Sequence, residues 1–134
     1  MKIEKPVKVA IFGMVNGHIY LWYRMLCRDP KTEVVAVSIN TSMVDVEYVK
    51  DILYKANKNV EVYYDDEEML NAHPEIELCF LGGTNKDTIK NFRMCAERGI
   101  HMYTMKVPTM SLAEYDEMIK LKNEKNLNVH TEME

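Results

Sequence analysis

Hydrophobic and polar positions along this chain follow two periods, which predict strands separated by helices from one end to the other. Short, nearly continuous apolar runs predict buried strands, because a strand covered on both sheet faces carries apolar side chains at most positions. Between them, apolar residues recur every three or four positions, as in helices that bury one face. The predicted strands are 7–12, 33–39, 60–64, 78–81, 100–104 and 127–131. The predicted helices are 17–28, 44–57, a short one opened by 65–68, one that ends at 99, and one that begins after 111.

Capping residues support the last two helices. Asn85 or Asp87 can cap the fourth helix, and Gly99 follows its last turn as a glycine that favours helix termination. Ser111 precedes the fifth helix, and Glu114 three residues later completes a capping box. Both helices therefore have sequence signals at their ends as well as along their length.

Strands that alternate with helices favour an α/β domain built on a doubly wound parallel sheet, with helices on both faces in three layers. Right-handed crossovers then favour the strand order 3-2-1-4-5-6, with the switch point between the first and fourth strands. Ligands bind such sheets at the carboxyl ends of the strands beside the switch point. The loops that meet there are 13–18, 40–42, 82–88 and 104–108. The sequence therefore predicts a single crevice formed by four loops.

The first of these loops carries part of a dinucleotide-binding fingerprint. The full pattern, G-x-G-x-x-G, needs three glycines, for the tight turn, for a close approach to the pyrophosphate and for helix packing. This chain has Gly13, Val15 and His18 at those positions, with Gly17 beside the third. Backbone N–H groups from Asn16 onward can hold a phosphate at the start of the helix. A glycine turn of this kind also occurs in α/β folds that bind no nucleotide, so both interpretations stay open.

Composition narrows the class of protein further. A length of 134 residues predicts one domain, 1–134, and the net charge of -4 gives no reason to expect nucleic acid or an anionic membrane as a partner. The three cysteines show no C-x-x-C spacing, which favours neither a disulfide framework nor a zinc site. The four histidines are scattered, so no metal site is predicted. No leader segment precedes the first strand, and we expect a cytoplasmic protein.

Three stretches of the sequence resemble one family. The most specific, from 95 to 119, reads C-A-E-R-G-I-H-M-Y-T-M-K-V-P-T-M-S-L-A-E-Y-D-E-M-I. In members of this family, which is named below, a helix ending Ala-x-x-Gly leads into a strand ending Glu-Lys-Pro, and a helix beginning Ser/Thr-Leu follows. The stretch is similar to that pattern. The stretch L-G-G-T-N at 81–85 looks like an A-T-P-N loop, and V-A-I-F-G-x-x-x-G-H at 9–18 is similar to the family's opening. The whole chain thereby resembles the N-terminal NAD(P)-binding Rossmann domain of the glucose–fructose oxidoreductase / inositol dehydrogenase (Gfo/Idh/MocA) family.

The resemblance implies an oxidoreductase that transfers hydride between a sugar, polyol or related hydroxy compound and NAD or NADP. Lys106 occupies the family's lysine position, where the lysine helps to move a proton to or from the substrate oxygen. It is the implied catalytic residue. The implied cofactor-binding residues are Gly13, Val15, Asn16, Gly17, His18, Asn40, Thr41, Gly83, Thr84, Asn85 and Lys106.

Several residues depart from the family pattern. Val15 replaces the second glycine, where a branched side chain crowds a pyrophosphate, and Asn40 stands where an acid commonly binds the adenosine ribose. Met105 and Val107 replace the residues on either side of the family's lysine, and Thr88 replaces a histidine found in many relatives. These departures support an alternative hypothesis, a non-catalytic Rossmann-type binding or regulatory module with a degenerate cofactor site.

Two further expectations concern the cofactor and the partners. Asn40, Thr41 and Ser42 can serve a ribose hydroxyl or tolerate a 2′-phosphate, but no arginine is adjacent, so NAD and NADP both stay open. Relatives continue into a second domain that covers the nicotinamide and carries the substrate-binding residues. That domain is absent from these 134 residues, so we expect exposed apolar surface around 102–110 and the last strand, and hence a homo-oligomer.

Overall fold

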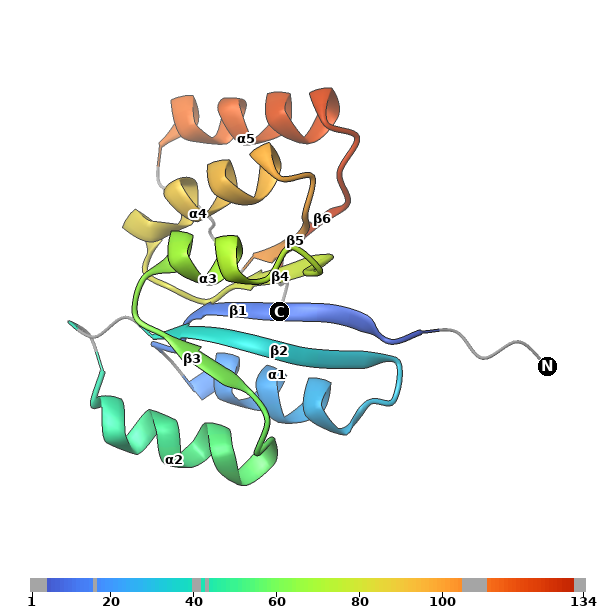
Figure 1. Ribbon diagram of the computed structural model, residues 1–134. Coiled ribbons are helices and arrows are strands. Elements are labelled where there is room, and N and C mark those ends of the chain that lie inside the picture. Colours follow the sequence, from blue (N-terminus) through green and yellow to red (C-terminus); the bar gives the residue numbers. More distant parts are fainter. Residues whose placement is uncertain (1–4, 16, 40–41, 43, 105–110, 132–134) are drawn as a thin grey trace.

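The computed structural model describes residues 5–15, 17–39, 42, 44–104 and 111–131, with only the backbone described at Asn85, Lys86 and Thr131. Six parallel strands form one sheet in the order β3-β2-β1-β4-β5-β6, as the sequence predicts (Figure 1). The strands are β1 (Val7–Gly13), β2 (Thr32–Ile39), β3 (Glu61–Tyr63), β4 (Leu78–Leu81), β5 (His101–Thr104) and β6 (Val129–Thr131). The helices are α1 (Gly17–Arg28), α2 (Val46–Ala56), α3 (Asp66–Ala72), α4 (Asn85–Glu97) and α5 (Leu112–Glu124).

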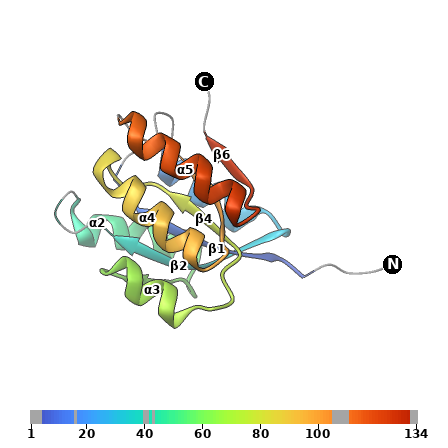
Figure 2. The ribbon, with the colours of Figure 1, turned by 90° about the horizontal axis from the view of Figure 1, so that it is seen from above.

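The sheet separates two hydrophobic cores. Helices α1 and α2 cover one face, and α3, α4 and α5 cover the other, where α5 lies alongside α4 (Figures 1 and 2). Strand β1 shows why both faces need cover, because Val9 and Ile11 belong to the core under α1 and α2, and Ala10 and Phe12 to the opposite one. All four side chains are fully buried. This is the arrangement that a continuous apolar run predicts for a central strand.

The helix caps agree with the sequence in one case and correct it in another. Ser111 caps α5 and accepts a hydrogen bond from the N–H of Glu114 at 3.3 Å, as expected. The N-cap residue of α4 is Thr84, in extended conformation, which lies one residue before Asn85 and three before Asp87, the two expected caps. Asp87 stands at the third helical position and accepts from the Thr84 N–H and hydroxyl, at 3.3 and 3.0 Å. Thr84 thereby fixes the loop that follows β4.

Within the described residues, no helix combines the length and the apolar character needed to cross a bilayer. Cys79 and Cys95 are buried free thiols, and Cys27 is a half-buried one.

Candidate functional site

The loops after β1 and β4 touch at the switch point of the sheet. Gly13 has a φ of +90°, and a Cβ there would lie 2.5 Å from the Cα of Gly83 and 2.7 Å from the carbonyl oxygen of Gly82. A Cβ on Gly82 would in turn meet Cγ1 of Ile19 at 2.5 Å. Only glycine fits such contacts, because any side chain would have to displace backbone or a buried helix residue. The protein's own backbone therefore already requires glycine at position 13.

The chain then passes through a tight turn into α1. Met14 has a φ of 59° and is fully buried, and the N–H of Val15 donates to the Gly82 carbonyl at 3.5 Å. The Val15 amide is thus directed at protein rather than at the crevice. Gly17 and His18 are exposed, and beyond its chain neighbours and its own helix backbone a Cβ on Gly17 would meet no atom of the described residues within 4 Å. The start of α1 is therefore open, with the positive end of the helix dipole at its tip.

A polar cavity of about 300 Å³ lies beside Gly13, at the carboxyl ends of β1 to β4. This crevice is small for a whole dinucleotide, since small-molecule sites commonly measure 300–1,000 Å³. It can hold one part of such a ligand. Its walls come from the end of β2 and the loop after it, the start of α3, and the first two turns of α4. The lining residues are Gly13, Ile39, Ser42, Tyr64, Asp65, Asp66, Gly83, Asp87, Lys90 and Asn91.

Three carboxylates line this crevice, and each is held by nearby donors. Asp65 caps α3 and accepts from two backbone N–H groups at 2.9 and 3.1 Å. Asp87 is held in the α4 capping box. Asp66 accepts a hydrogen bond from the Ser38 hydroxyl. Burial raises the pKa of Asp66 from its ordinary value, while the Ser38 hydrogen bond and the charge of Lys90 act in the opposite direction.

Asn91 lines the crevice with a buried acceptor atom that receives no hydrogen bond from the described residues. Its side chain is 1% exposed, and its Oδ1 atom has no hydrogen-bond partner. It stands one helical turn after Asp87, on the same side of α4. A buried acceptor without a donor is costly, so such a group often marks a place where a ligand supplies the missing partner.

The structure brings several predicted site residues together. Gly13 and Gly83 line the crevice, and Thr84 caps the helix at its edge. Gly17 and His18 form the open start of α1, and Val15 lies against Gly82. The other predicted positions, Asn16, Asn40, Thr41, Lys106 and the side chain of Asn85, lie outside the described residues.

Other crevice residues were not singled out from the sequence. Ile39 is the last residue of β2 and pairs with Gly13, and the chain continues with Asn40, where an acid commonly stands. The carboxylates of Asp65 and Asp66 come instead from the crossover after β3. The run of acids after the third predicted strand was a usable signal, since it follows a strand's carboxyl end. Nothing in the sequence marked Asn91.

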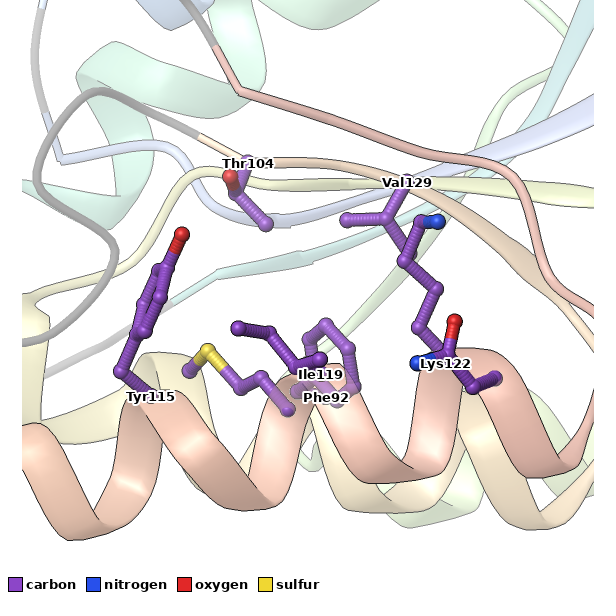
Figure 3. Close-up of a pocket in the computed structure, with 8 residues that line it drawn as sticks. Phe92, Thr104, Tyr115, Ile119, Lys122 and Val129 are labelled. Atoms are coloured by element: carbon purple, nitrogen blue, oxygen red, sulfur yellow. The ribbon is translucent and has the colours of Figure 1, made fainter.

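A second hollow of about 300 Å³ lies between α5, α4 and the β5–β6 edge of the sheet (Figure 3). Phe92, Met118, Ile119 and Val129 give it an apolar lining, and the Tyr115 side chain extends toward Thr104. None of its lining residues belongs to the crevice at the switch point. Within the described part of the chain, no group of three or more His, Cys, Asp or Glu side chains is placed to hold a metal ion.

No protein-family model and no curated protein matches this sequence. Solved structures do resemble it. Biliverdin reductase from Synechocystis, solved with biliverdin and NADP+, has a TM-score of 0.78 at 19% identity, over 95% of this chain and 38% of that one. D-galactose-1-dehydrogenase from Rhizobium etli has a TM-score of 0.74 at 20% identity, over 96% of this chain and 38% of that one. GenD2 of gentamicin A biosynthesis, solved with NAD, has a TM-score of 0.82 at 13% identity, over 98% and 35%.

The chain has a Rossmann-type α/β fold. At these identities the likeness establishes that fold and nothing finer. The chain also spans little more than a third of the length of these three neighbours.

Proposed function

We propose that this chain is the nicotinamide-dinucleotide-binding domain of an oxidoreductase. The proposal extends to the Gfo/Idh/MocA type, which acts on a sugar, polyol or related hydroxy compound. The observation that carries it is the switch-point site, where the Gly13 turn, the open start of α1 and a polar crevice adjoin. Its fold neighbours include one protein solved with NADP+ and one solved with NAD.

In this proposal each part of the site has its own task. The exposed N-terminus of α1, at Gly17 and His18, binds the pyrophosphate through backbone N–H groups and the helix dipole. The crevice beside Gly13 takes the adenosine part, in keeping with its size. When bound, the nicotinamide supplies the carbon that accepts or gives up hydride.

Lys106 is proposed to move the proton. It follows β5 by two residues, and the carboxyl end of β5 lies beside that of β4. A lysine can exchange a proton near neutral pH only where burial or a neighbouring positive charge lowers its pKa. This role therefore requires that Lys106 is shielded from solvent or lies beside another positive charge.

A binding or regulatory module without catalysis is the second candidate. It is favoured by the Val15 N–H, which donates to Gly82 instead of facing a phosphate, and by Asn40 in place of the acid that commonly binds the adenosine ribose. In this candidate the cofactor site is degenerate, and the protein has no turnover.

Calorimetric titration with NAD+, NADH, NADP+ and NADPH tests whether the chain binds a dinucleotide. We expect weak binding of at least one of them, abolished by Gly17→Glu, which adds a negative charge where the pyrophosphate is proposed to lie. Gly17→Ala is the matched control, because a Cβ there meets no atom within 4 Å. Absence of binding in the unaltered chain, or equal binding by Gly17→Glu, would refute the proposal.

A further inference from the structure

The crevice beside Gly13 offers mainly hydrogen-bond acceptors. Carboxylates from Asp65, Asp66 and Asp87 line it, together with the buried Asn91. Lys90 is the one lysine or arginine among the described lining residues, and it lies exposed at the surface. At neutral pH the lining therefore carries three potential negative charges against one positive charge.

Such a lining suits a ligand group that donates hydrogen bonds. A ribose with two free hydroxyls, or the amino group of adenine, can donate to carboxylates and to the unpartnered Oδ1 of Asn91. A phosphate on the ribose replaces a donor with a dianionic group that carries three acceptor oxygens. Acceptors would then face acceptors, and like charges would face each other in a partly buried site.

We infer that this crevice selects the unphosphorylated dinucleotide, NAD(H), over NADP(H), through the carboxylates of α3 and α4. The inference rests on the proposed function and names the ligand of that same site. It differs from the usual arrangement, in which an acid about twenty residues after the glycine motif binds the ribose. Here Asn40 follows β2 in place of that acid, and the charge is supplied by the crossovers after β3 and β4.

Asp66 is the decisive carboxylate. Ser38 of β2 donates to it, so its position is fixed beside the end of that strand, where the usual acid is missing. Asp65 and Asp87 also hold helix caps, so changing them would disturb α3 or α4 as well as the crevice. Asp66 stands at the first helical position of α3 and caps nothing.

The test compares dissociation constants for NAD+ and NADP+ in the unaltered chain and in two charge variants. We expect NAD+ to bind at least tenfold more tightly. Asp66→Asn removes one negative charge from the crevice, which corresponds to a change of about tenfold in the preference when partial burial and screening are allowed for. The ratio of the NADP+ dissociation constant to the NAD+ dissociation constant should fall by that factor, because NADP+ binds more tightly. Lys90→Gln removes the one cation among the described lining residues and should raise the ratio.

Asp51→Asn is the matched control. It makes the same chemical change on α2, where Asp51 is exposed and pairs with Lys55 at 3.0 Å, outside the crevice. It should leave the ratio unaltered. Circular dichroism on each variant establishes that the fold is intact.

The outcomes separate this inference from the proposed function. Equal affinity for the two cofactors, or a preference for NADP+, overturns the inference and leaves dinucleotide binding standing. A ratio that neither Asp66→Asn nor Lys90→Gln changes also overturns it, because the crevice charge then does not discriminate. Binding of neither cofactor overturns both.

Discussion

Two glycines near the start of α1 have different roles. A Cβ at Gly13 would lie 2.5 Å from Gly83, and its φ of +90° is unfavourable for any other residue. Strain and overpacking together predict that Gly13→Ala lowers the free energy of unfolding by about 2–4 kcal/mol. Gly17→Ala should leave it unchanged or raise it slightly, since the site is open and alanine favours helix. Urea unfolding of the two variants measures the difference, and equal midpoints would contradict it.

The side chain of Val15 is expected to hinder cofactor binding. Its branched side chain stands at the second glycine of the fingerprint. Removing that side chain opens the backbone, so Val15→Gly should tighten binding of NAD(H) or NADP(H) by about tenfold, on the scale of 1.4 kcal/mol per decade. Val15→Ile keeps the branch and should bind as the unaltered chain does. Calorimetry on all three decides, and unchanged affinity in Val15→Gly would show that this side chain does not obstruct the ligand.

At the scale of elements, one buried hydroxyl joins α1 to α2. Tyr23 of α1 is fully buried and donates to the carbonyl of Leu53 in α2 at 2.6 Å. Burial, with a smaller contribution from Cys27 beside it, raises the pKa of Tyr23 far above its ordinary value. In the unfolded chain the same phenol ionises near pH 10. Its stabilising effect is therefore complete below about pH 10 and is lost as the pH rises above that value.

Tyr23→Phe tests this pair of helices. At neutral pH the variant should lose about 1 kcal/mol of unfolding free energy, because one buried hydrogen bond is gone. Above pH 10 its stability should fall less steeply than that of the unaltered chain. Tyr48→Phe, on the exposed side of α2, is the control and should change neither quantity. Denaturant unfolding over a series of pH values gives both readouts, and parallel curves for the two variants would refute the account.

The elements themselves were predictable from sequence because each depends on local periodicity. Helix α1 was predicted at 17–28 and spans Gly17–Arg28, and the strand order follows from right-handed crossovers. The residues that line the crevice were harder to predict from sequence. Its loops were predicted, but Asp66 and Asn91 line the same crevice only because α3 and α4 begin on the same side of the sheet. Such proximity is a property of the tertiary structure, and no single sequence position signals it.

At the scale of the whole molecule, apolar surface was expected around 102–110 and the last strand. Met102 lies in the core at 1% exposure, Val129 is half-buried, and 105–110 lie outside the described residues. Exposed apolar side chains also line one side of α5, with Leu112, Tyr115 and Ile119 at 83%, 48% and 42%. Their spacing of three and four residues places them on one stripe.

We expect copies of this chain to associate through the α5 stripe. Leu112→Glu combined with Ile119→Glu should shift the protein toward monomer, because charge replaces apolar contact. Leu21→Glu, at an exposed apolar position on α1, should not. Light scattering over a dilution series measures the mass of each protein. A monomeric mass for the unaltered chain at high concentration would contradict the prediction.

Catalysis should require more than these residues. The 134-residue chain covers only 35–38% of the length of the fold neighbours described above. Holding a substrate against the nicotinamide contributes several kcal/mol of barrier lowering, and we propose that the residues for this task lie outside the chain. Left uncovered, Lys106 should stay hydrated and protonated. We therefore expect the chain to bind cofactor without appreciable turnover of any sugar or polyol, as followed by NADH absorbance.

A protein that continues beyond this chain should behave differently. There Lys106→Ala should lower turnover by a factor of roughly a hundred or more, the usual range for losing a general acid or base. Lys120→Ala, an exposed lysine on α5, is the control and should have no effect. If Lys106→Ala leaves the turnover of the longer protein unchanged, Lys106 has no catalytic role and is an ordinary surface lysine. Robust turnover by the 134-residue chain would show that the substrate is held by residues already present.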